Sequence, residues 1–311
     1  MKGTAKCHIL AVLAVQLPLA LLVAITLFAE KRRPALRSPY AMLAAVAVIE
    51  VLFVVFFIRA IRRGGSGFGA LSIICFVWLL LLAWEICTSV TAIAHPVLIP
   101  SPENVFDTFR TRWRDMLLNI WYSMRLLLAG FITGLSAAVI CGAFVGWFPR
   151  LRAFAYPIAN VMTPIPPVVF SPYLVAIMPS FRSASILVIF LGVFWPTFLT
   201  TINRVGSIDQ HILDTARMLG VKSRAMIFRI IFPCIFPGVI SGLRVSLTTS
   251  LLMLNFAELM GASHGMGYFI QNSIAYANYT NAVAGIIVVG IVVTILAHLA
   301  AFIQRHAVKW H

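Results

Sequence analysis

Acidic residues are scarce in this chain: 9 Asp and Glu stand against 24 Lys and Arg among 311 residues. Charged residues of both signs make up only 11% of the sequence, whereas hydrophobic residues make up 61%, and the mean hydropathy is +0.98. A soluble globular domain is excluded by this composition, because too few polar residues are present to cover its surface. The sequence therefore predicts an all-α, polytopic membrane protein.

The chain also lacks the motifs of common catalytic and metal sites. It contains no GxxxxGK[ST] phosphate loop, and the glycine-rich stretch at 261–267 has no strand before it. His264 and His298 have no Cys, His or carboxylate at helical spacing, and the five cysteines form no CxxC pair. We therefore expect no catalytic residue, no metal site and no cofactor bound by this chain.

The net charge of +15 does not indicate a nucleic-acid partner, because the basic residues are dispersed among the loops between apolar segments. If residues 204–233 and the C-terminus face the cytoplasm, most loop Lys and Arg lie inside, as the positive-inside rule requires. One loop does not fit this orientation: Lys31, Arg32, Arg33 and Arg37 fall outside. Membrane topology explains the remaining positive charge.

Eight apolar segments have about the length that a membrane-spanning helix needs, roughly 20 residues. They cover residues 9–29, 41–58, 70–94, 117–148, 153–178, 185–202, 235–260 and 282–303. In the fourth, Gly134, Ala138 and Gly142 give a small-residue face that permits a close helix neighbour. The fifth contains several prolines and is not expected to be one straight helix, because each proline removes a backbone donor.

A broken span belongs beside protein or a water-filled path, so we expect the proline-rich break to line a translocation route. The alternative is a purely structural kink. Polar residues inside other spans are further candidates, since a buried charge must face protein or water. The candidate pathway residues are Asn160, Thr163, Pro164, Pro166, Pro167, Arg125, Asn255 and Glu258. Glu258 either shapes the outer end of this route or pairs with Arg125 or another buried cation, and Glu50 and Glu85 are expected to be structural.

The longest polar interruption in the C-terminal half is residues 207–233. Ser207 and Gln210 have capping-box spacing, and Gly220 stands where a short helix would end. The predicted apolar stripe of this helix is Ile208, Ile212, Ala216 and Leu219. A second helix is expected over 223–232, with Pro233 stopping it. A solvated connector is the alternative interpretation of this pattern.

At these residues the chain resembles a known family. Asp214-Thr215-Ala216, Gly220 and residues 230–233 are similar to the EAA loop of ABC importer permeases, with Asp in place of Glu, Thr in place of the first Ala and Phe in place of Leu. The similarity runs from about residue 98 to the C-terminus and is greatest to the nitrate/sulfonate/taurine group. In that family the loop forms coupling helices that dock on a separate ATPase. The resemblance therefore implies an ATPase-coupling role for Ser207, Asp209, Ile212, Asp214, Thr215, Ala216, Arg217, Gly220, Val221, Phe228 and Pro233.

The resemblance further implies a six-helix permease core plus two extra N-terminal helices. The expected division is an N-terminal hairpin at 1–69 and a core at 70–311 that contains the cytoplasmic coupling loop 204–233. Expected partners are two ATP-binding subunits, which hold the ATP and Mg, a second permease protomer, a solute-binding protein and the lipid bilayer of a bacterial inner membrane. The implied solute is a small one such as nitrate, taurine, an alkanesulfonate or bicarbonate. An ion-coupled secondary transporter, with Glu50, Glu85 and Glu258 carrying protons, is the alternative.

Overall fold

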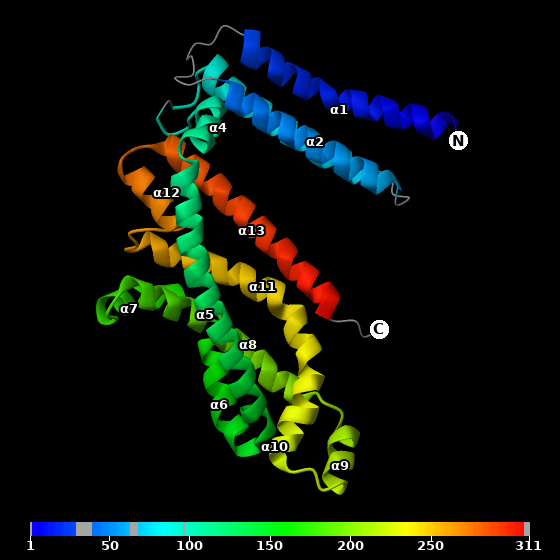
Figure 1. Cartoon of the computed structure of the whole chain (residues 1–311), viewed down its shortest axis with the longest axis vertical. Coiled ribbons are helices and arrows are strands. Elements are labelled where there is room, and N and C mark those ends of the chain that lie inside the picture. The colour runs from blue at the N-terminus through cyan, green and yellow to red at the C-terminus, as the bar shows by residue number, and fades with distance from the viewer. Residues whose placement is uncertain (1, 29–38, 63–67, 96, 308–311) are drawn as a thin grey trace. The chain divides into compact units, whose positions relative to one another are not determined.

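The computed structural model describes residues 2–28, 39–62, 68–95 and 97–307, with side chains from residue 15 onward, and every regular element among them is a helix (Figure 1). The basic loop with Lys31, Arg32, Arg33 and Arg37 lies outside the described residues. The helices are α1 (Lys2–Phe28), α2 (Tyr40–Arg62), α3 (Phe68–Glu85), η1 (Ile86–Val90), α4 (Pro102–Thr111), α5 (Trp113–Trp147), α6 (Pro149–Met162), η2 (Pro167–Phe170), α7 (Ser171–Ile177), α8 (Phe181–Gly206), α9 (Gln210–Met218), α10 (Ser223–Ala225), η3 (Met226–Ile231), α11 (Phe232–Leu259), α12 (Met266–Ala275) and α13 (Tyr279–Ala307).

Six helices in the described part of the chain are long and apolar enough to cross a membrane, and a bent pair gives a seventh if it counts as one span. The bent pair is α6 with η2 and α7, turned by 80° at the break. The predicted span at 9–29 corresponds to α1, whose part with described side chains, Val15–Phe28, is a shorter apolar helix. The helices α4 and α12 were not predicted, because both are too short to span a membrane and follow turn-rich segments.

The chain divides into two compact units. The first comprises Met1–Met116 and Asn272–Ile286. Its apolar core joins α1, α2 and α3, and its buried members are Leu22, Met42, Val46, Phe53, Leu71, Ile74, Trp78 and Leu81. Glu50 in α2 accepts a hydrogen bond from Gln16 in α1, and Glu85 at the end of α3 is wholly buried. Glu50 thus links two helices of this unit, as expected for a structural carboxylate.

The second unit comprises Leu117–Gln271 and Ile287–His311. Its helices α5 and α8 approach closely along a line of glycines, since an added Cβ at Gly134 would lie 2.9 Å from the Phe190 carbonyl oxygen. At Gly142 the added atom would lie 2.7 Å from Cβ of Thr201. Ala138 between them is fully buried. The predicted small-residue face is therefore confirmed, and its neighbour is α8.

Candidate functional site

The connector between α8 and α11 folds into α9 and α10, but its caps differ from the prediction. Asp209 caps α9, accepting a hydrogen bond from His211 N at 2.9 Å, whereas Ser207 ends α8 and donates from its hydroxyl to the Arg204 carbonyl. The capping-box prediction was wrong because α8 continues to Gly206, which places Ser207 at that helix's C-terminus. Gly220 follows α9 with φ of +69°, as the predicted helix end requires.

Pro233 does not stop a helix. The backbone continues from Ser223 to Leu259 as one 37-residue span, with η3 just before the proline. In η3 the hydrogen bonds run from residue i to i−5, as between Phe232 N and the Ile227 carbonyl. This wider turn places Pro233 in the first turn of α11, where a missing N–H is tolerated.

One face of α9 is held on the second unit by apolar burial. Leu213 and Ala216 join a core cluster with Ala143 of α5, Val205 of α8 and Ile231 of η3. The predicted apolar stripe was half wrong, because Ile212 and Leu219 are 47% and 77% exposed while Leu213 is buried. Spacing alone did not separate two apolar faces on such a short helix.

A cation–π contact also holds α9 on the second unit. The Arg217 guanidinium carbon lies 5.4 Å from the centre of the Trp147 ring at the end of α5. Arg217 also pairs with Asp214 at 2.8 Å, but both side chains are half exposed, so this pair stabilises the helix by less than about 1 kcal/mol. Thr215 is exposed. Asp214 and Thr215 therefore remain on the open surface of α9.

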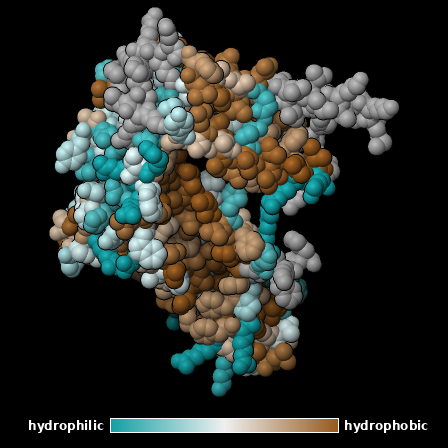
Figure 2. Space-filling view, turned by 45° about the horizontal axis from the view of Figure 1, so that its top comes forward, coloured by the Kyte–Doolittle hydropathy of each residue, from teal (hydrophilic) through white to brown (hydrophobic). Residues whose placement is uncertain are grey.

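The rest of the connector carries an aromatic stack. Phe228 of η3 lies 5.5 Å from Phe232 and 6.0 Å from Phe144 of α5, ring centre to ring centre, yet 57% of its surface is exposed. Val221 is partly buried against the cluster that holds Leu213. In Figure 2 hydrophilic side chains project from the lower end of the visible face, where Figure 1 places α9 and α10, and hydrophobic side chains dominate its middle.

The broken span places most of its predicted residues around one cavity. Thr163, Pro164, Pro166 and Pro167 line a space of about 200 Å³ together with residues of α8 and α11. Gly192 of α8 sits where these segments meet, since an added Cβ would lie 3.3 Å from Met253 and 3.8 Å from Pro167. The prediction that the prolines break the helix is confirmed. Asn160 is exposed on α6 and is not among the residues that line this cavity.

Glu258 is buried without a cation. Its Oε1 accepts from the Ser123 hydroxyl at 2.5 Å and its Oε2 accepts from Gly267 N at 2.7 Å. Ser123 Oγ in turn accepts from Met266 N, so this carboxylate ties α11, α5 and the start of α12 together. The alternative that Glu258 pairs with Arg125 or another buried cation was wrong, because none of the ion pairs among the described residues includes Glu258. Sequence inspection missed Ser123, which carries no motif.

The turn over Glu258 requires glycine. Gly265 has φ of +131°, and an added Cβ there would lie 2.4 Å from Cδ of Glu258. Asn119 of α5 accepts a hydrogen bond from Gly265 N at 2.8 Å. The glycine-rich stretch therefore serves close packing over a buried carboxylate.

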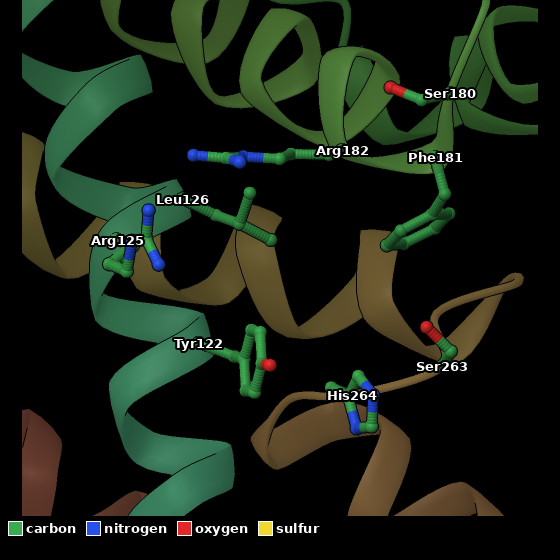
Figure 3. Close-up of a pocket in the computed structure, with 8 residues that line it drawn as sticks. All are labelled: Tyr122, Arg125, Leu126, Ser180, Phe181, Arg182, Ser263 and His264. Carbon is green, nitrogen blue, oxygen red and sulfur yellow. The ribbon is translucent and has the colours of Figure 1, made fainter.

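The remaining pathway candidates lie on α5 and α11, two of the helices that this network joins, but form no hydrogen bond with Glu258. Arg125 of α5 lines a cavity of about 320 Å³ at the start of α8 (Figure 3). Asn255 of α11 donates from its side-chain amide to the Leu251 carbonyl, while its Oδ1 is buried without a hydrogen-bond partner among the described residues. No group of three His, Cys, Asp or Glu within the described ranges could hold a metal ion.

Long apolar helices, a broken span beside a cavity and a hydrophilic connector packed on the helix ends define a multi-pass membrane protein. The chain belongs to the family of binding-protein-dependent transport system inner membrane components, whose family model matches residues 130–310. It is thus the inner-membrane permease of an ABC importer and not an enzyme, because the ATPase is a separate subunit. This assignment decides against the secondary-transporter alternative.

Individual proteins agree with the family. The chain is 27% identical over 257 residues to the taurine transport system permease protein of Escherichia coli, covering 80% of this chain and 91% of the relative. It is 26% identical over 281 residues to the nitrate import permease protein of Leptolyngbya laminosa, covering 89% and 95%. Among solved structures, the inward-facing methionine ABC transporter MetNI matches with a TM-score of 0.50 at 17% identity, covering 65% of this chain and 99% of that one.

Proposed function

We propose that this permease carries a small anion into the cytoplasm and that α9 is the element on which the ATP-binding subunit docks. The coupling proposal rests on the two apolar faces of α9, one buried and one exposed. Leu213 and Ala216 are buried in the second unit. Ile212, Met218 and Leu219 are 47%, 89% and 77% exposed. Exposed apolar side chains at a hydrophilic end are typical of a docking surface. The ATPase would cover them.

The connections of α9 supply a mechanical route. Its buried cluster includes residues of α5, α8 and η3, and Arg217 lies over Trp147 of α5. A displacement of α9 would therefore displace α5, α8 and η3 as well, because close-packed elements transmit strain and move together as a rigid body. ATP binding would shift the permease between inward-open and outward-open states by favouring one position of α9. Two ATPases, a second permease protomer and a solute-binding protein complete the proposed assembly.

The proposed solute class draws on two relatives. They are named for taurine and nitrate; taurine carries a sulfonate and nitrate is itself an oxyanion. In the proposed route, the solute passes the cavity formed by Thr163, Pro164, Pro166 and Pro167, with Asn255 and Glu258 on the neighbouring span. The hairpin at 1–69 is proposed to be an addition to the permease core.

A charge reversal tests the docking of α9. Asp214→Lys should abolish co-purification of the ATP-binding subunit with the permease while leaving membrane insertion intact, because it places a cation on the docking surface. Asp115→Lys is a matched control, since Asp115 also pairs with an arginine three residues away, at 3.3 Å, and is 51% exposed, against 55% for Asp214. Wild-type recovery of the ATPase with Asp214→Lys would refute the docking role.

A further inference from the structure

A second cavity in the second unit lies at the start of α8. It has a volume of about 320 Å³ and is lined by Tyr122, Arg125, Leu126, Ser180, Phe181, Arg182, Ser263 and His264. These residues come from α5, from the N-terminus of α8 and from the turn before α12 (Figure 3). Three segments distant in the sequence thus build one concave site of the size used for small molecules.

The charged side chains that line this cavity are both positive. Arg125 and Arg182 both line it, no carboxylate does, and in Figure 3 the two guanidinium groups lie beside Leu126 at one side of the site. Neither guanidinium makes an ion pair or a hydrogen bond with any described residue. Two uncompensated cations in one hollow favour an anionic occupant, and the planar donor fork of arginine fits the oxygens of a sulfonate, phosphate or carboxylate.

The backbone adds to this preference. Ser180 is the N-cap of α8, accepting from Ser183 N, and Phe181 and Arg182 form the first turn of this 26-residue helix. The N-terminus of a long helix carries partial positive charge and unpaired N–H groups, so it attracts anions. The positive end of α8 therefore opens on the same cavity as the two arginines.

Another part of the cavity lining is aromatic. The imidazole of His264 stacks on Tyr122 with ring centres 4.7 Å apart and an angle of 16° between the planes. Tyr268 meets the same imidazole edge-on at 6.4 Å. These contacts position an imidazole, which carries at least one N–H donor, in the lining of the cavity, and they leave apolar surface for the body of a small organic anion.

We propose that this cavity is a binding site for a small oxyanion, with Arg125 and Arg182 as its principal ligands. The assignment of that anion to the transported solute, as opposed to a lipid head group, rests on the function proposed above; the binding itself does not. Nitrate, sulfate or the sulfonate group of a small organic acid has suitable chemistry.

Arginine protection tests the site directly. The permease without its ATPase would be held in nanodiscs of zwitterionic lipid and treated with phenylglyoxal, with modification of each arginine followed by mass spectrometry. Methanesulfonate should slow modification of Arg125 and Arg182, whereas the neutral analogue methanesulfonamide should not. Arg244 of α11 is the internal control, because it is exposed but lies outside the cavity lining.

Substitutions measure how much each arginine contributes to anion binding. Arg125→Gln and Arg182→Gln should each weaken methanesulfonate binding about tenfold, the expected loss for one charge-assisted contact, while Arg244→Gln should leave it unchanged. Equal modification of Arg125 and Arg182 whether or not methanesulfonate or phosphatidylglycerol is present would overturn the site. Protection by phosphatidylglycerol in the nanodisc but not by methanesulfonate would overturn the solute assignment in favour of a lipid head group.

The two proposals fail separately. If the ATP-binding subunit co-purifies normally and no anion protects the arginines, only the anion site is wrong. If the arginines are protected and Asp214→Lys still retains the ATPase, only the docking role of α9 is wrong.

Discussion

Truncating Leu213, the buried leucine of α9, tests how this helix is held on the permease. Leu213 is 6% exposed and packs in the cluster that joins α9 to α5, α8 and η3. Leu219, at the end of the same helix, is 77% exposed. Leu213→Ala and Leu219→Ala therefore remove the same atoms from opposite environments. We expect the first change to loosen α9 on the permease and the second to weaken only its contact with the ATPase.

The size of the expected destabilisation follows from the burial of the leucine side chain. Removing a buried leucine side chain costs about 2 to 5 kcal/mol, whereas an exposed substitution changes stability by at most about 0.5 kcal/mol. The remaining anchors of α9 are Ala216, too small to replace that burial, and the Arg217 contact over Trp147, which contributes about 0.5 to 1 kcal/mol at an exposed site. A loss of ~2.7 kcal/mol changes an opening equilibrium about a hundredfold.

Hydrogen exchange measures this opening. In Leu213→Ala the amides of α9 should exchange about a hundredfold faster than in the wild type, while the amides of α5 and α8 keep their protection. The Leu219→Ala permease should exchange as the wild type does but bind less ATPase. Unchanged protection of α9 in Leu213→Ala would refute the argument that burial of this side chain holds the helix.

Three further changes probe the turns and the broken span. Gly220→Ala should destabilise the end of α9 by about 1 to 2 kcal/mol, because φ is +69° there and no atom lies within 4 Å of the added Cβ; a thermal unfolding midpoint equal to the wild type would contradict this. Gly265→Ala should cost more, since strain adds to a clash with Glu258, and an equal loss in both variants would count against the clash. Replacing Pro166 and Pro167 by Ala should reduce solute uptake in vesicles more than membrane insertion, and normal uptake would make the break a scaffold only.

Features set by local sterics were predictable from the sequence. The prolines of the fifth span break its helix whatever surrounds them, because each lacks a backbone donor. The spacing of Gly134, Ala138 and Gly142 likewise indicates a close neighbour, although it does not say that the neighbour is α8. The length of each apolar segment located the long spans, because this length depends only on the composition of that segment.

Features set by tertiary contacts were not predictable. Ser123 and Glu258 are 135 residues apart, and nothing near either one signals the hydrogen bond that joins them. Arg182 was overlooked because its significance lies in sharing a cavity with Arg125. Which apolar side of α9 is buried depends on the position of the α5 and α11 surfaces, so Leu213 could not be chosen over Ile212 from spacing alone.

Photo-crosslinking from the exposed end of α9 tests the central claim most directly. Benzoylphenylalanine at position 218, where Met218 is 89% exposed, should crosslink to the ATP-binding subunit in intact membranes. The same probe at position 128, on the exposed face of α5 within its span, should not. Crosslinks to the ATPase from position 218 alone are the predicted result. Failure of position 218 to capture the ATPase in a transporter that is assembled and active would contradict the account.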